Sequence, residues 1–191
     1  MNLVLASQSP RRRELLSLIQ KDFTVQSSCV EEIVPEGLTA EETVVYLAKL
    51  KAEEVAQWLK TSTDSQKTVV IGADTVVVLD GEIMGKPKDR DDCIRMISLL
   101  SGRQHEVYTG VAIVVKGQTE SFYQRTAVRF LDLTKEEIEW YASLQEPYDK
   151  AGAYGIQGFG SLLVEGIDGD YFNVMGLPVA ALNRRLKKYL Q

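Results

Sequence analysis

The sequence predicts an α/β protein built around a mixed, twisted sheet with flanking helices. Strand patterns and helix patterns alternate early in the chain, as they do in proteins of this class. The later half instead carries hairpin signals, in which two strand-like runs are joined by a glycine-containing turn. With 191 residues the chain can bury one sizeable core, which we expect to divide into two lobes around a cleft within a single domain, residues 1–191.

The composition argues against several classes of function. Hydrophobic residues make up 45% of the chain and charged residues 26%, which is ordinary for a soluble globular protein. The formal net charge of −5 disfavours a general nucleic-acid-binding surface, so we expect no nucleic acid partner. No apolar stretch approaches the length of a membrane span and the start has no signal-peptide pattern, so we expect a cytoplasmic protein without membrane contact.

Histidine and cysteine are too scarce for most metal sites. His105 is the single histidine, which argues against zinc clusters and histidine-based triads. Cys29 and Cys93 match no close-spaced metal motif, and Cys93 shares a helical stripe with Met96 and Ile97 that predicts packing. Any metal must therefore be held by oxygen ligands.

Three consecutive arginines, residues 11–13, open the first predicted helix. Residues 3–6 form a short apolar run typical of a buried strand, and a turn follows with Ser9 as N-cap and Pro10 at the first helical position. The exposed N–H groups at this end of a helix already carry partial positive charge, so each arginine costs a few tenths to roughly 1 kcal/mol. A polyanion such as a nucleotide phosphate chain would compensate for that cost.

A helical wheel separates the three arginines. We expect the buried face to consist of Leu15, Leu18 and Ile19. Arg11 and Arg12 then flank the N-terminal end of this face, whereas Arg13 points to water. Arg11 and Arg12 are therefore the candidates for binding an anion. The alternative is that all three are solvated or paired with acidic neighbours.

An acidic pair, Glu31 and Glu32, follows the next predicted strand, residues 23–29. Taken alone, such a pair is typical of solvated surface charges. The second predicted helix then begins at Thr39, because a glutamate three residues later completes a capping box.

Lys51 lies within the apolar stripe of this second helix, about 20° from Val44 on the wheel. Its ammonium either extends outward to water or, where this face borders a cleft, reaches an anion. A polar run at residues 61–66 predicts a loop after the helix.

An acid interrupts the next strand pattern, residues 68–79. Aspartate is unfavourable inside strands and costly to bury unless it is paired, hydrogen-bonded or bound to a metal, so Asp74 is a candidate functional residue. A hairpin turn at residues 80–81 returns the chain toward Lys86 and places Thr75 opposite it, unless a bulge at Gly72 or Gly85 shifts the pairing by one residue. A purely structural ion pair between Asp74 and Lys86 is the alternative.

Two further hairpins are predicted in the later half. The first joins residues 112–115 to residues 121–130 through Lys116-Gly117. The second joins residues 161–167 to a strand at residues 171–175.

A glycine-spaced loop at residues 149–158 precedes the second of these hairpins. It lacks the phosphate-binding P-loop pattern, and an ordinary surface turn is an alternative interpretation. Gln157 in this loop offers donors and an acceptor that suit the edge of a nucleotide base.

Several separated motifs together resemble the Maf family of nucleoside triphosphate pyrophosphatases, and the resemblance covers nearly the whole chain. In chain order they are Leu5-Ala6-Ser7-Gln8-Ser9-Pro10-Arg11-Arg12, Gly72-Ala73-Asp74-Thr75, Gly85-Lys86-Pro87, Leu99-Leu100-Ser101-Gly102 and residues 149–158. The resemblance implies an inosine-triphosphatase-like α/β fold, with two lobes around a central cleft. It also implies a divalent cation, Mg²⁺ or Mn²⁺, and cleavage of a nucleoside triphosphate into the monophosphate and pyrophosphate. A homodimer is plausible from the resemblance only.

The resemblance also implies roles for individual residues. Asp74 would be the catalytic base and, together with Glu32, would hold the metal. The phosphates would be bound by Ser7, Arg12, Lys51 and Lys86. The positions tied to base choice in the dTTP/UTP pyrophosphatase subgroup are matched by Arg11, Thr75 and Gln157. Gln157 could accept a hydrogen bond from N3–H of uracil or thymine, a group that cytosine lacks.

Two classes of function follow from these observations. The first is a dTTP/UTP pyrophosphatase that removes particular triphosphates from the cytoplasmic pool. The second is a nucleotide-binding regulator of cell division and septum formation, with incidental hydrolysis. A third reading, a single-strand nucleic-acid binder, needs a basic, aromatic-lined groove and conflicts with the acidic total.

Overall fold

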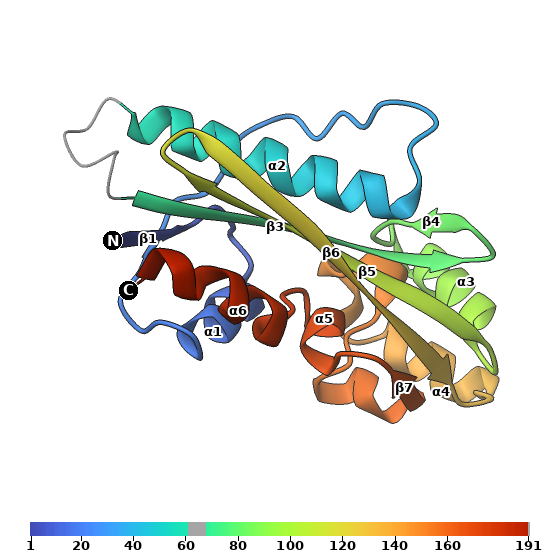
Figure 1. Cartoon of the computed structure of the whole chain (residues 1–191). Coiled ribbons are helices and arrows are strands. Elements are labelled where there is room, and N and C mark those ends of the chain that lie inside the picture. The colour runs from blue at the N-terminus through green and yellow to red at the C-terminus, as the bar shows by residue number, and fades with distance from the viewer. Residues whose placement is uncertain (61–67, 191) are drawn as a thin grey trace. The chain divides into compact units, whose positions relative to one another are not determined.

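A computed structural model describes residues 1–60 and 68–190 (Figure 1). The predicted loop at residues 61–66 lies outside the described residues. The strands are β1 (Asn2–Leu5), β2 (Thr24–Val25), β3 (Thr68–Leu79), β4 (Glu82–Met84), β5 (Gln104–Val115), β6 (Gln118–Phe130) and β7 (Val164–Asp168). The α-helices are α1 (Pro10–Ser17), α2 (Ala40–Leu59), α3 (Arg90–Leu100), α4 (Lys135–Ala142), α5 (Tyr171–Met175) and α6 (Val179–Leu190). Three short 3-10 helices lie between α4 and β7, namely η2 (Glu146–Asp149), η3 (Ala151–Ala153) and η4 (Gly158–Leu162).

The strands form a mixed sheet in the order β2-β1-β3-β5-β6-β7, with β4 paired to β3. Strand β1 pairs in parallel with β2 and β3, whereas β4 and β7 pair antiparallel with β3 and β6. This arrangement confirms the predicted α/β class with a mixed sheet and flanking helices. The described residues divide into two compact units, unit 1 from ranges 1–74, 109–124 and 176–191 and unit 2 from ranges 75–108 and 125–175.

One core cluster of unit 1 lies between helix α2 and the strands, and its buried members are alanine and valine residues. Ala48, Ala52 and Val55 of α2 pack with Val70 of β3 and Ala112 of β5. Glycines occupy two points at which the sheet closely approaches this helix, Gly72 beside Ala48 and Ala52 and Gly110 beside Val44. A Cβ atom added at Gly72 would lie 2.3 Å from the Ala48 carbonyl oxygen and 2.9 Å from the Ala52 Cβ. The main chains of α2 and β3 are therefore in direct contact, with no room for a side chain at this point.

The core of unit 2 surrounds helix α3 and contains the predicted packing stripe. Cys93, Met96 and Ile97 are all buried there, as the sequence pattern predicts. His105 is also buried, with its ring edge-on to Phe130 and its Nε2 atom 2.7 Å from the Tyr154 hydroxyl. Burial lowers the pKa of His105 to about 4, so the ring is neutral near pH 7.

Several local predictions are confirmed by the backbone. Ser9 caps α1, and Thr39 caps α2 through the predicted capping box with Glu42. The hairpin turn between β3 and β4 has positive φ at both central residues, 52° at Asp80 and 83° at Gly81. This is the backbone twist that a two-residue hairpin loop requires.

The extents predicted for two early elements are wrong. Helix α1 ends at Ser17, so the buried residues are Leu15 and Leu16, whereas Leu18 is 64% exposed. The helix has only eight residues, so Leu18 and Ile19, which the helical wheel places on the buried face, lie beyond its last turn. The strand predicted at residues 23–29 is reduced to β2, because only Thr24–Val25 pairs with β1.

The last predicted hairpin is also wrong, since residues 171–175 form helix α5 instead of a strand. Asp170 begins this helix: its Oδ1 accepts from the Phe172 N–H at 2.8 Å. Its main-chain N–H and C=O both pair with the Thr126 hydroxyl at 3.0 Å. An aspartate of this kind favours a helix start over a return strand, and the apolar pattern alone does not reveal it.

Candidate active site

The site in unit 1 begins with the position of Asp74 on β3. Successive side chains of a strand alternate between faces, so Asp74 shares a face with Gly72. Gly72 is the point at which β3 touches α2, between Ala48 and Ala52. Lys51 lies on the same face of that helix, and its Nζ atom is 2.7 Å from Asp74 Oδ1. The close approach at Gly72 therefore brings the ammonium and the buried carboxylate together.

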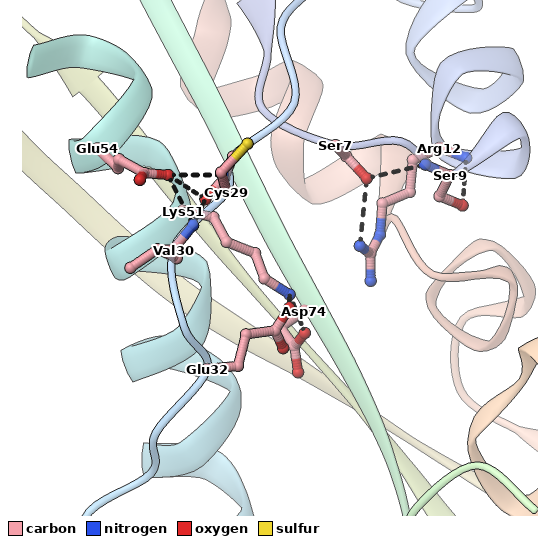
Figure 2. Close-up of polar contacts among 10 residues, drawn as sticks. Ser7, Ser9, Arg12, Cys29, Val30, Glu32, Lys51, Glu54 and Asp74 are labelled. Atoms are coloured by element: carbon pink, nitrogen blue, oxygen red, sulfur yellow. Dashed lines mark hydrogen bonds and ion pairs between the residues drawn. The ribbon is translucent and has the colours of Figure 1, made fainter. Parts of the chain in front are cut away.

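A second carboxylate reaches the same ammonium. Glu32 Oε1 lies 2.9 Å from Lys51 Nζ, and Figure 2 shows the two acidic side chains meeting at this nitrogen. Only 13% of the Lys51 side chain and 12% of the Asp74 side chain are exposed, compared with 50% for Glu32. Lys51 thus does not extend outward to water, and Glu32 is more than a solvated surface charge. The three groups carry one positive and two negative charges.

The N-terminal end of α1 contributes Arg12. The Ser9 hydroxyl accepts from the Arg12 main-chain N–H at 3.4 Å, and the buried Ser7 hydroxyl accepts from Arg12 Nη1 at the same distance (Figure 2). Arg12 Nε donates to the Gly176 carbonyl at 2.9 Å. The guanidinium is therefore oriented from two directions, by a serine before α1 and by the segment before α6.

The charges around Arg12 connect it electrostatically with Asp74 and Glu32. Desolvation by burial lowers the pKa of Arg12 below its ordinary value, and the neighbouring charge of Arg11 lowers it further. Asp74 and Glu32 act in the opposite direction and raise this pKa. Arginine stays protonated in proteins, so the guanidinium is a fixed positive charge in the field of both carboxylates. Arg13 is exposed, as predicted.

The carboxylates of Asp74 and Glu32 suit a divalent cation that also binds the phosphates of a ligand. Among residues 1–60 and 68–190, no group of three or more His, Cys, Asp or Glu side chains could hold a metal ion. Asp74 and Glu32 nevertheless converge on one cationic nitrogen, and carboxylate oxygens are the donors that Mg²⁺ and Mn²⁺ prefer. Mg²⁺ is commonly bound by one or two carboxylates together with substrate phosphates.

Unit 2 carries the other candidate residues, Thr75, Lys86 and Gln157. Strand β4 ends at Met84, so the predicted position of Lys86 opposite Thr75 lies beyond the paired residues. Lys86 is exposed, and its segment is tied to the glycine-spaced loop by a hydrogen bond of 2.9 Å from the Gly152 N–H to the Gly85 carbonyl. The convergence of these three residues with Asp74 and Arg12 stays a prediction.

A carboxylate that the sequence patterns do not single out holds the loop of Gln157. Glu146 accepts from the Phe159 N–H at 3.1 Å, from the Gly160 N–H at 3.0 Å and from the Tyr141 hydroxyl at 3.1 Å. Glu54 of α2 plays a comparable part near Glu32. A glutamate that accepts hydrogen bonds from loop amides has no sequence signature, because its partners are main-chain atoms. Only the fold reveals such residues.

Comparisons with known proteins show which family the chain resembles along its length. A family model described as Maf-like protein matches residues 2–189. The dTTP/UTP pyrophosphatase of Bacillus cereus (strain ATCC 14579) is 48% identical over 187 residues, which cover 98% of this chain and 95% of that protein. The dTTP/UTP pyrophosphatase of Bacillus pumilus (strain SAFR-032) is 46% identical, with coverage of 98% and 96%.

Two further observations complete these comparisons. The solved structure of the Staphylococcus aureus Ham1 protein matches 69% of this chain and 73% of its own, with a TM-score of 0.44 and 19% identity. Among the residues that the structure describes, no helix has both the length and the apolar character needed to cross a membrane.

Proposed function

The chain belongs to the Maf-like protein family, and on that premise we propose that it is a nucleoside triphosphate pyrophosphatase acting on dTTP and UTP. The family match spans residues 2–189, and relatives named for that activity align with 98% of the chain. The observation that carries the proposal is the meeting of Asp74, Glu32 and Lys51 on one face of β3, within the electrostatic range of Arg12.

The proposed reaction is hydrolysis of the α–β phosphoanhydride. A water oxygen forms a bond to phosphorus, the bridging P–O bond breaks, and the products are the monophosphate and pyrophosphate. Such a displacement needs an aligned water, an acceptor for its proton and positive charge near the phosphate oxygens. An ionised carboxylate can accept the proton, and cationic side chains can stabilise the developing negative charge.

The residues of unit 1 divide these tasks. Asp74 takes the proton of the attacking water, and Lys51 fixes the direction of its carboxylate through the 2.7 Å contact. Arg12, oriented by Ser7 and the Gly176 carbonyl, presents its guanidinium to the phosphates. Lys86 is proposed as a second phosphate-binding cation from unit 2. The cationic side chains thus offset the excess negative charge of the carboxylates and offer charged hydrogen bonds to a polyphosphate.

A divalent cation is part of this proposal, with Asp74 and Glu32 as its protein ligands. When bound, Mg²⁺ or Mn²⁺ would polarise the phosphate and lower the pKa of a coordinated water. The side chain of Glu32 is half exposed, so its carboxylate is accessible to a cation that arrives with the nucleotide.

Base choice is proposed to depend on Arg11, Thr75 and Gln157. Gln157 lies at the N-terminal end of η4, in the loop that Glu146 holds in place. Its amide can accept from the N3–H of uracil or thymine and donate to an adjacent carbonyl, a pairing that cytosine cannot complete. A cytoplasmic location, a single domain over residues 1–191, a homodimer and the absence of a nucleic acid partner stay predictions.

The experiment that tests this function is a substrate panel. The purified chain is incubated with dTTP, UTP, CTP, ATP or GTP and with Mg²⁺ or Mn²⁺, and the release of pyrophosphate and orthophosphate is measured separately. We expect dTTP and UTP to give equal amounts of monophosphate and pyrophosphate. Orthophosphate as the sole inorganic product would reject the proposed bond of attack, and equal turnover of all five nucleotides would reject the proposed base choice.

A further inference from the structure

We propose that Glu54 is a positioning residue that fixes the loop at residues 28–32, so that Glu32 presents its carboxylate to the cation site. The inference rests on the proposed function, because it assigns Glu54 an effect on the divalent cation that Asp74 and Glu32 would hold. None of the polar contacts drawn for Glu54 in Figure 2 joins it to Asp74 or Lys51.

Three hydrogen bonds converge on a single oxygen of Glu54. Its Oε2 atom accepts from the Ser28 hydroxyl at 2.5 Å. The same atom accepts from the Cys29 N–H at 2.9 Å and the Val30 N–H at 3.0 Å (Figure 2). The Ser28 hydroxyl also accepts from the Val30 N–H at 3.2 Å. Hydrogen bonds to an ionised carboxylate are stronger than bonds between neutral groups, so this cluster defines the backbone two residues before Glu32.

Helix α2 thus holds the loop at two points one turn apart. Lys51 and Glu54 are separated by three residues, which places them on neighbouring positions of one helix face. Lys51 binds the side chain of Glu32, and Glu54 binds the main chain that leads to it. A basic and an acidic residue of one helix therefore set both the start of the loop and the direction of its carboxylate.

Core packing contributes little to the position of this loop. Residues 31–37 are all exposed, and the apolar side chain of Ile33 is 64% exposed, so core packing does not fix this segment. Cys29 is exposed as well, whereas Glu54 is half-buried. Without the three bonds, we expect the loop to sample several positions and Glu32 to meet the cation only part of the time. Residues that orient a metal ligand without touching the metal change metal affinity by about 10- to 100-fold when replaced.

The experiment measures Mn²⁺ binding to the nucleotide-free protein, by electron paramagnetic resonance of free Mn²⁺ or by calorimetry. We expect E54A to weaken Mn²⁺ binding about tenfold, and E54Q, which keeps an acceptor oxygen without its charge, to weaken it by about threefold. The matched control is E53A, because Glu53 neighbours Glu54 on α2 but is exposed and accepts its hydrogen bond from the Thr119 hydroxyl of β6. The E53A protein should bind Mn²⁺ as the wild type does.

A second readout separates positioning from general damage. In E54A, raising the Mn²⁺ concentration should restore the kcat for dTTP to within about twofold of the wild type, since the chemical groups are intact. Circular dichroism should show unchanged helix content. If E54A does not fold, E54Q and S28A take its place. S28A removes one of the three donors, and we expect each of the two variants to weaken Mn²⁺ binding by about threefold.

Each outcome decides the matter. Wild-type Mn²⁺ affinity in folded E54A, or in E54Q and S28A, overturns the proposal, as does an equal loss in E53A. Wild-type affinity in E32Q would show that Glu32 is no ligand and would also overturn it. Release of pyrophosphate from dTTP by the wild-type chain would in that case leave the proposed function standing, so the two failures are distinguishable.

Discussion

The loop before Glu32 in unit 1 and the loop around Gln157 in unit 2 are held by the same device in different settings. In each, one glutamate accepts two main-chain N–H groups and one hydroxyl. Glu54 uses a single oxygen and stands on a 20-residue helix that packs on the sheet, whereas Glu146 uses both oxygens and opens a four-residue 3-10 helix.

The difference lies in what each loop depends on. The partners of Glu146 lie within 14 residues of it in the sequence, so the part of the unit 2 loop next to Gln157 is held by local contacts. The partners of Glu54 lie 24 to 26 residues away, and the helix that carries it is located by contact with β3 at Gly72. The unit 1 site therefore depends on tertiary packing, and substitutions in the core of unit 1 should alter metal binding and catalysis at the site. Changes in the unit 2 loop should stay local.

The largest effect is expected for the group assigned to the chemistry itself. Asp74→Asn keeps the shape of the side chain but removes its ability to accept the water proton, so we expect kcat for dTTP to fall by about 10³-fold or more. The measurement is steady-state pyrophosphate release, with Asp80→Asn, a surface residue paired with Arg103, as control. If the protein is a regulator of cell division, Asp74→Asn should keep its effect on division although pyrophosphate release is lost. Loss of both in this variant would favour the enzyme.

The single histidine should make unit 2 the acid-sensitive part of the molecule. His105 has a pKa of about 4 when folded and about 6.5 when unfolded, so between these values the unfolded state binds more protons. The neutral ring therefore contributes fully to the free energy of unfolding above pH 6.5. This contribution, about 3 kcal/mol, is lost as the pH falls to 4.

Urea unfolding of wild type and His105→Gln between pH 7 and pH 4 measures this difference, since the carboxylates titrate alike in both. Trp58 of unit 1 and Trp140 of unit 2 allow each unit to be followed separately after replacement of the other tryptophan by phenylalanine. Equal pH slopes for the two proteins would contradict the assignment.

Gly72→Ala tests whether packing in unit 1 reaches the site. The added Cβ would meet main-chain and Cβ atoms of α2, which cannot move aside as a flexible side chain could. We expect a loss of about 3 kcal/mol in the free energy of unfolding and weaker Mn²⁺ binding, because Glu32, which α2 holds through Lys51 and Glu54, is pushed away from Asp74. Gly166→Ala is the control, since its Cβ would meet no atom closer than 4.0 Å. Unchanged Mn²⁺ affinity in Gly72→Ala would show that the contact at Gly72 does not set the site.

The smallest effect is expected for Gln157→Ala, and it should be confined to base choice. We expect the ratio of kcat/KM for UTP over CTP to fall by about tenfold, with the Mn²⁺ dependence unchanged. Ser161→Ala, an exposed hydroxyl in the same 3-10 helix, should keep the wild-type ratio. A change in Mn²⁺ dependence in Gln157→Ala would remove the distinction between the two loops.

The sequence predicts the local features of the site well and its connections poorly. The caps at Ser9 and Thr39 and the buried acid on β3 follow from short-range rules, and the structure has all three. The partners of Lys51 could not be chosen from the sequence, because Asp74 approaches it through the contact at Gly72 and Glu32 through the loop that Glu54 holds. Helix α5 resembles a strand in sequence because a five-residue segment with four apolar or aromatic side chains does not distinguish the two.

The contact at Gly72 also bears on how the sequence of α2 can drift over time. Where two main chains touch, their separation is set by the radii of backbone atoms and not by the volume of any side chain. Substitutions on the side of the 20-residue helix that faces away from the sheet should therefore leave that separation unchanged. A chain that retains glycine at 72 and alanine at 48 and 52 can therefore exchange much of the surface of α2 while the span from ammonium to carboxylate stays constant.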